Sequence, residues 1–256
     1  MADARSPRKI PKTVGGTLFG QPIVEPLNYL PGRYPFPAQL KARQLRQLQE
    51  SHKARWIGRG EILFREGELP RAVCIVLEGR IKRSITSSRG RTLVIGFWGT
   101  GSVIGLEANI LDRAYMTTAE AVRETLVMAV GRSELIGESQ TNAAAAWLVT
   151  QLVSENSYFL AGKLASFGLA ESTPQSVARC CLVELSAARA DGERERVRLD
   201  LNQETIAQLL GLSRETVSRQ LARFRRAGLL EWDRCSFVIR DRQALEKIAE
   251  LPSAAA

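Results

Sequence analysis

Short apolar runs broken by glycine fill the chain from Trp56 to about residue 130. The runs are four to eight residues long and rich in Val, Ile, Leu and aromatic residues, which is typical of β-strands. They are EILF (61–64), AVCIVLEG (72–79), RIKRSIT (80–86), TLVIGFWG (92–99) and TLVMAV (125–130). Glycines separate the runs at turn spacing. We therefore predict a small antiparallel barrel or sandwich over this segment.

The apolar spacing changes to a helical period between residues 139 and 167, where no proline interrupts the chain. Two adjacent seams at steps of four, three and four predict one long helix with a wide apolar stripe. The seams are Leu148, Leu152, Glu155 and Phe159, and Val149, Val153, Asn156 and Leu160. Such a helix either packs onto its own barrel or forms a parallel homodimeric coiled coil whose register is set by polar Asn156 and Glu155. We favour the dimer.

A third pattern begins at Gln203. In a twenty-residue window from that position, Ala207 is fifth, Gly211 ninth and Val217 fifteenth. A helix-turn-helix needs a small residue where its helices cross, a glycine in the turn and an apolar residue that locks the second helix. The segment GLLEWDRCSFVIRD (228–241) follows as two short strands, which predicts a winged helix. An αα-hairpin that binds no DNA is the alternative.

The net charge of the chain predicts a polyanionic partner. The 256 residues carry a net charge of +9 and a pI near 9.8, which favours nucleic acid or an acidic membrane surface. No apolar stretch is long enough to span a bilayer and no secretory signal is visible, so we expect a cytoplasmic protein without a membrane partner. The four cysteines, Cys74, Cys180, Cys181 and Cys235, form no C-x-x-C pair, which fits reduced thiols.

The start of the second helix of this motif carries the candidate DNA-reading residues. Arg214, Glu215, Ser218 and Arg219 share one helical face. Arginine can pair with guanine and a carboxylate can accept from cytosine, so an Arg–Glu–Arg cluster is suited to base reading. Ser213 caps the helix, and both Ser213 and Thr216 are candidate phosphate contacts. More distal arginines are expected to add affinity without sequence choice: Arg223, Arg225 and Arg226.

At this point the sequence resembles the Crp/Fnr family of bacterial transcription regulators over about residues 56–250. The stretch 60–83 is similar to the family's cyclic-nucleotide-binding-type β-roll, 99–110 to its phosphate cassette and 213–219 to its recognition motif. The resemblance implies an α+β fold with an N-terminal β-roll, a long dimerisation helix and a C-terminal winged helix-turn-helix. The expected parts are a proline-rich arm (1–40), the β-roll sensor domain (41–138), the dimerisation helix (139–170) and the DNA-binding domain (171–256). A short helix is also predicted at about 38–53.

The resemblance also implies partners and a target. Arg214, Glu215 and Arg219 match base-reading residues of cAMP receptor proteins, and Glu215, Ser218 and Arg219 match those of Fnr-type members. A homodimer on double-stranded DNA with TGA-containing half-sites is implied, together with contact to RNA polymerase. The loop around Ala187–Arg196 and the hairpin Thr86–Arg91 are candidate surfaces for that contact.

The cassette departs from the cAMP-binding members of the family. Those members carry Gly-Glu followed about ten residues later by Arg-Ser or Arg-Thr. Here Gly105 is followed by Leu106, Glu107 comes one place late, and no arginine stands at 116 or 117. We therefore predict an unknown ligand or none, and no cofactor. A cAMP-dependent regulator in which Glu107 and Arg113 compensate is the alternative.

Other sensor chemistries and other function classes have less support. Residues 1–73 contain no cysteine, which excludes the Fnr-type iron–sulfur set, and the single histidine, His52, is expected to lie on the surface. The sequence shows no catalytic triad, metal-ligand cluster or phosphate-binding G-x-x-x-x-G-K-[ST] loop, so no catalytic or metal site is predicted. A winged-helix protein-interaction module remains a second alternative.

Overall fold

The computed structural model of the 256-residue chain describes residues 54–168, 170–190, 202–233 and 236–249. It also describes two short paired strands, β1 (Thr17–Leu18) and β2 (Gln21–Pro22). The rest of the predicted arm, the helix predicted at 38–53, His52 and Cys235 lie outside the described residues.

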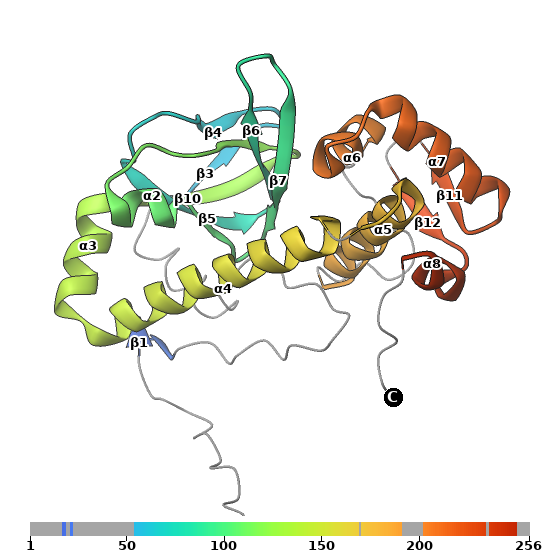
Figure 1. Ribbon diagram of the computed structural model, residues 1–256. Helices are drawn as coiled ribbons and strands as arrows, with labels where there is room; N and C mark the ends of the chain where they lie inside the picture. The colour runs from blue at the N-terminus through green and yellow to red at the C-terminus, as the bar shows by residue number, and fades with distance from the viewer. Residues whose placement is uncertain are drawn as a thin grey trace, which may run out of the picture.

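Two four-stranded antiparallel sheets form the first domain (Figure 1). In sheet order, the first sheet contains β3 (Ala54–Ile57), β10 (Thr125–Gly131), β5 (Ala72–Glu78) and β8 (Val103–Ile104). The second contains β4 (Ile62–Phe64), β9 (Thr118–Ala121), β6 (Arg80–Thr86) and β7 (Thr92–Gly99). The five apolar runs all fall on strands, which confirms the predicted all-antiparallel β-domain.

A tight turn at Gly79 joins β5 to β6 and brings the start of β10 close to them. Gly79 has a left-handed φ of 100°, and a Cβ atom there would lie 2.5 Å from Thr125 Oγ1. The same hydroxyl oxygen accepts a hydrogen bond from the backbone N–H of Arg80 at 3.1 Å. Only glycine allows this close approach of the two segments.

The long helix predicted for 139–167 is wrong at its N-terminal end. The structure has two helices, α3 (Arg132–Thr141) and α4 (Ala143–Gly168), separated by Asn142 in an extended conformation. The Asn142 Oδ1 atom accepts hydrogen bonds from the backbone N–H groups of Ala144 and Ala145 at 3.0 and 3.3 Å. Asparagine is a strong N-cap residue, so it starts a new helix without a proline or glycine break.

The α4 helix packs along its own β-roll. Leu148 and Leu152 are buried in an apolar cluster with β5 and β10, and Phe159 is buried against the interior of the roll. Asn156 is only 3% exposed within its own chain. The first predicted seam therefore serves the intrachain core, and the predicted role of Asn156 in setting a coiled-coil register is wrong. The short strand β1 also lies against α4.

The second domain confirms the predicted winged helix-turn-helix. Its elements are α5 (Thr173–Ala190), α6 (Gln203–Leu210), α7 (Arg214–Arg226), β11 (Leu230–Asp233), β12 (Ser236–Ile239) and α8 (Arg242–Ala249). The Asn202 side chain caps α6, and Gly211 takes the left-handed conformation that the turn requires, with φ of 65°. Apolar side chains from α5, α6, α7 and α8 form one core.

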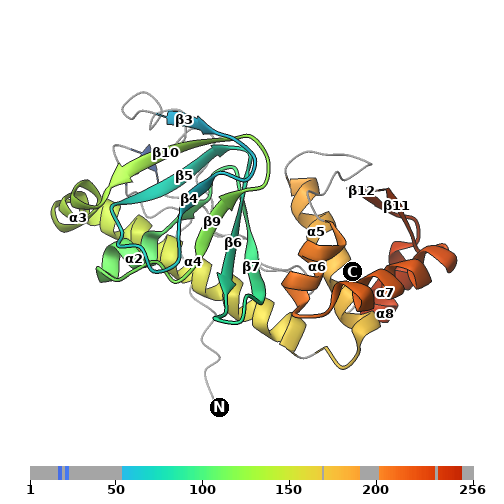
Figure 2. The same ribbon diagram turned by 90° about the horizontal axis from the view of Figure 1, so that it is seen from above.

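The two domains touch through β7. Val94 and Phe97 on this strand belong to the same apolar cluster as the helix-turn-helix core, and α6 lies against β7 (Figure 2). The Arg91 guanidinium also donates a hydrogen bond to the carbonyl oxygen of Gly211 in the turn. As a result α6 lies between β7 and α7, and α7 is held away from the β-roll.

Candidate nucleic-acid interface and sensor site

The start of α7 is fixed by its cap. The Ser213 hydroxyl oxygen accepts from the backbone N–H of Thr216 at 3.2 Å, and the hydroxyl groups of the two residues are 3.0 Å apart. Both candidate phosphate contacts are therefore joined to each other at the helix terminus. Backbone N–H groups at such a terminus also favour an anionic group nearby.

The α7 helix has one buried face and one exposed face. Val217, Leu221 and Phe224 are buried in the domain core. On the other side Arg214, Glu215 and Arg219 are exposed, and Ser218 is half-buried between the two faces. The structure therefore brings the four predicted base-reading residues together on the first two turns of the helix. The distal arginines are exposed as well: Arg223, Arg225 and Arg226.

Glu215 carries its charge at a place that stabilises it. Hydrogen bonds from its own backbone N–H and from the Ser213 side chain lower the pKa of this carboxyl below its ordinary value. The charges of Arg214 and Arg219 act in the same direction. A carboxylate in the first turn also interacts favourably with the helix dipole. The face thus presents an ionised acceptor between cationic donors.

The cassette region folds as α2 (Leu106–Leu111), whose cap is Gly105 in the left-handed conformation, with φ of 80°. A Cβ atom on Gly105 would lie 2.9 Å from the Tyr115 ring, so the position requires glycine. Leu106 is buried, 1% exposed. Glu107, at the start of α2, lies 4.0 Å from Arg83 between charged atoms.

Arg83 occupies the interior of the β-roll beside this cassette. Its side chain is 13% exposed, and its Nε atom donates to Thr117 Oγ1 at 2.9 Å. The guanidinium lies 4.7 Å from the centre of the Trp98 ring, which is favourable as a cation–π contact. Burial lowers the pKa of Arg83, and the carboxylate of Glu107 opposes that shift.

Aromatic side chains close the same region toward α4. Trp98 meets Phe159 edge to face with ring centres 5.8 Å apart. A Cβ atom on Gly96 would lie 3.2–3.3 Å from atoms of these two rings. Aromatic rings therefore pack closely on the side of this region that faces α4.

Sequence reasoning placed Glu107 in the cassette but missed Arg83 as its cationic neighbour. Arg113, which the cAMP-dependent alternative requires beside Glu107, is exposed beyond the other end of α2. The available signal was the alternation of β6, because Ile81 and Arg83 share one strand face and Ile81 is fully buried. A charged residue at an inward position of a strand needs a polar or charged partner, so Arg83 could have been predicted to face one inside the β-roll.

The described cysteines are all free and buried: Cys74, Cys180 and Cys181. Burial raises the pKa of Cys74 to about 12. Because the thiolate is the reactive species, we expect iodoacetamide to leave Cys74 unlabelled in the native protein at neutral pH and to label it in urea. Peptide mass spectrometry of the two samples checks this. Rapid native labelling would mean that Cys74 is a reactive, sensor-type thiol.

Within the described ranges, no three His, Cys, Asp or Glu side chains gather as a possible metal site. The described helices include none with the length and apolar character needed to cross a bilayer.

Family models match both domains. Residues 54–142 match the cyclic nucleotide-binding domain, and residues 175–248 match the Crp-like helix-turn-helix domain. The first match covers the β-roll and α3, and the second covers the helix-turn-helix domain.

Curated relatives cover most of the chain. One is the CRP-like cAMP-activated global transcriptional regulator of Mycobacterium tuberculosis, 28% identical over 75% of this chain and 85% of that protein. Another is the transcriptional activator protein anr of Pseudomonas aeruginosa, 28% identical over 76% of this chain and 80% of that protein.

The fold also matches solved structures. FixK2 from Bradyrhizobium japonicum superimposes with a TM-score of 0.69 and 25% identity, covering 80% of this chain and 99% of that one.

Proposed function

This chain belongs to the Crp/Fnr family of DNA-binding transcription regulators, and we propose that it acts as a homodimer that reads a palindrome with TGA-type half-sites. The relatives that match over about three quarters of this chain are named as transcription regulators. The observation that carries the proposal is the exposed, ionised Glu215 between exposed Arg214 and Arg219 at the start of α7.

A carboxylate on a DNA-facing surface repels phosphates, so its presence among arginines favours base reading. Glu215 would accept from cytosine N4, and arginine would pair with guanine O6 and N7. Ser218 on the same face is assigned to base contact, and Ser213 and Thr216 to phosphate contact. Each good bidentate pair contributes about 1–3 kcal/mol of discrimination against a wrong base.

Dimerisation is proposed through a different face of α4 from the two seams read in the sequence. The exposed positions follow steps of three and four, which is the spacing of a coiled-coil seam. They are Trp147, Thr150, Ser154, Ser157, Ala161 and Leu164. The middle of this seam consists of small side chains, which let two helices approach closely. The large side chains at its ends, Trp147 and Leu164, are 48% and 75% exposed and would be covered by the partner.

A two-fold axis along α4 would place two α7 helices on one side of the dimer. Such helices enter successive major grooves about one helical turn, roughly 34 Å, apart. Two half-sites then contribute twice the discrimination of one, which supports a palindromic target.

For the sensor domain we propose control without cyclic AMP, although one relative is named as cAMP-activated. The buried Arg83 is already engaged by Thr117, Glu107 and Trp98. A nucleotide phosphate would have to displace this arrangement and Phe159 behind it. A cytoplasmic location and contact with RNA polymerase are carried over from the family, with the exposed hairpin Thr86–Arg91 as the candidate surface. Most of the loop around Ala187–Arg196 lies outside the described residues.

Fluorescence anisotropy tests this function directly. The purified protein, without added ligand, is titrated onto a labelled palindrome of TGA-type half-sites and onto a scrambled duplex of the same composition. We expect a preference of at least about a thousandfold for the palindrome, the lower end of specific-to-nonspecific ratios in such proteins. Cyclic AMP should leave both affinities unchanged.

Three other outcomes are informative. Strong palindrome binding only after cyclic AMP is added would favour the cAMP-dependent regulator. Weak, equal binding to both duplexes under both conditions would contradict the proposed half-site. Salt-insensitive binding to a protein partner with no DNA affinity would favour the interaction module, because DNA binding through lysine and arginine weakens steeply with salt.

A further inference from the structure

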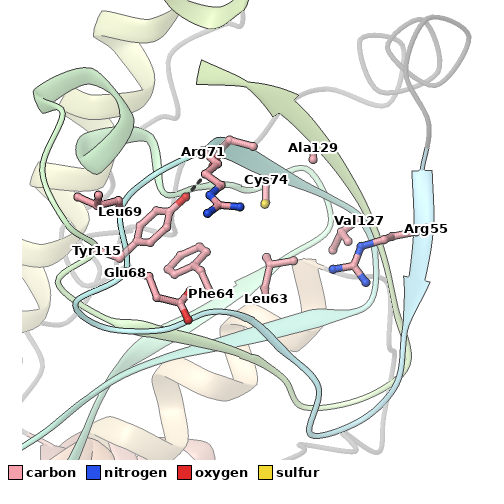
Figure 3. A pocket seen from close by; sticks show the side chains of 11 residues that line it. Arg55, Leu63, Phe64, Glu68, Leu69, Arg71, Cys74, Tyr115, Val127 and Ala129 are labelled. Atoms are coloured by element: carbon pink, nitrogen blue, oxygen red, sulfur yellow. Dashed lines mark hydrogen bonds between the residues drawn. The ribbon is translucent and has the colours of Figure 1, made fainter. Parts of the chain in front are cut away.

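A cavity opens in the β-roll, between β3, β4, β5 and β10. Its volume is about 670 Å³, within the range of small-molecule sites. Its lining includes neither Arg83 nor Glu107, so it is separate from the site beside the cassette where these two residues lie. Figure 3 shows side chains from β3, β4, β5 and β10 and from the segment between β4 and β5 around it.

The inner wall of this cavity is apolar. Leu63, Phe64, Cys74 and Val127 contribute to it, and Phe64 stacks on Tyr115 with ring centres 3.8 Å apart. The Tyr115 hydroxyl donates to the carbonyl oxygen of Ala72 at 2.8 Å, so its polar atom is satisfied within the protein. The Cys74 thiol is neutral because burial raises its pKa. This wall therefore offers contact to an apolar group and no charge.

Charged side chains stand at the exposed rim. Arg55 is paired with Glu61 at 3.0 Å, and the Glu68 carboxylate accepts from the backbone N–H of Arg65 at 3.0 Å. Arg71 differs from Arg55, because its guanidinium has no carboxylate within ion-pair distance among the residues that the structure describes. Its side chain reaches over Phe64 and Tyr115 toward the middle of the cavity (Figure 3).

We propose that this cavity binds an amphipathic monocarboxylate, with the carboxylate on Arg71 and the apolar body against the wall of Phe64, Tyr115 and Val127. A guanidinium presents paired donors that match a carboxylate in a bidentate arrangement. Glu61 already neutralises Arg55, and the Glu68 carboxylate is held by the backbone N–H of Arg65. Arg71 is therefore the lining cation that is left to bind a ligand, so an anion is preferred over a cation with the same tail. The site needs no DNA to be occupied, so it is tested independently of the proposed regulatory function.

Isothermal titration calorimetry on the full-length protein tests the proposal, with decanoate as the anionic probe below its micelle concentration. Decyltrimethylammonium is the cationic probe with the same tail. We expect one decanoate per chain and an affinity at least about tenfold weaker for the ammonium, as charge-assisted bonds require. Arg71→Gln should weaken decanoate by about tenfold or more on the same ground. Arg89→Gln, an equal charge change in the exposed β6–β7 hairpin, should bind like the wild type.

A second variant tests the cavity itself and not its charge. Ala129 lines the cavity and is exposed on β10, so Ala129→Trp fills the space without disturbing the buried core. This variant should lose saturable binding of decanoate while its thermal melting stays close to that of the wild type. Equal affinity for both probes, an unchanged Arg71→Gln variant, or no saturable decanoate binding by the wild type would each overturn the proposal.

Discussion

Replacing Arg219 with alanine is expected to remove most of the preference for the palindrome over scrambled DNA. Arg219 is exposed on the second turn of α7, next to Glu215 on the same face and opposite the buried Val217. Removing an arginine–guanine pair costs about 1–3 kcal/mol per half-site. A symmetric dimer loses it twice, which corresponds to between roughly thirtyfold and twenty-thousandfold in specific affinity.

The matched control is Arg226→Ala. Arg226 is also exposed on α7, but it lies seven residues farther on, about 10 Å along the helix axis. We expect this variant to weaken binding to both duplexes alike. The slope of log affinity against log salt should become shallower by about 0.9 for each phosphate that the variant no longer neutralises. Anisotropy titrations over a salt series measure both quantities.

The two variants separate base reading from simple charge attraction. Each removes one positive charge from an exposed helical position, so their effects on nonspecific DNA should be similar. If Arg219→Ala reduced binding to both duplexes by the same factor as Arg226→Ala, the face at the start of α7 would not read bases. Because both side chains are exposed, neither change should alter thermal unfolding measurably.

The DNA-binding domain was predictable because its constraints are local. The left-handed Gly211, the Ser213 cap and the buried Val217 each follow from residue type and spacing within twenty residues. The apolar strand runs were visible for the same reason. The strands β8 and β9 were not, because Val103–Ile104 is only two residues long and the run Thr118–Ala121 (TAEA) has little β character.

Features that depend on which elements face each other in the fold could not be predicted from the sequence. An asparagine inside an apolar helical period gives no sign that it caps a new helix, yet Asn142 does so. Arg83 meets Thr117 and Trp98 only because β6 lies between β9 and β7 in the folded sheet. The apolar seam at Leu148 and Leu152 fitted either a second copy or the β-roll, and the sequence pattern favoured the second copy. Only the packing of α4 on β5 and β10 decides between them.

Because one face of α4 packs on the β-roll, the proposed dimer seam lies on its exposed face, and a charge placed on that seam should prevent dimerisation. Leu164→Glu changes an exposed position of the proposed seam, and in a parallel dimer the two new carboxylates would face each other across the axis. Like charges at such a contact oppose pairing, and each would also lose water. We expect sedimentation or light scattering to show a monomer where the wild type is a dimer. Affinity for the palindrome should fall by roughly 10²–10⁴, the usual gain from linking two binding modules.

Leu111→Glu serves as the matched control, since Leu111 is 61% exposed on α2 and lies off the α4 seam. This variant should stay dimeric with unchanged palindrome affinity. Because Leu164 is 75% exposed in the single chain, Leu164→Glu should leave the fold of the monomer intact, with an unchanged far-UV circular dichroism spectrum. A Leu164→Glu protein that remained dimeric would place the interface on another face. A monomer that kept full palindrome affinity would show that one α7 helix suffices, and the two-fold reading of the site would be wrong.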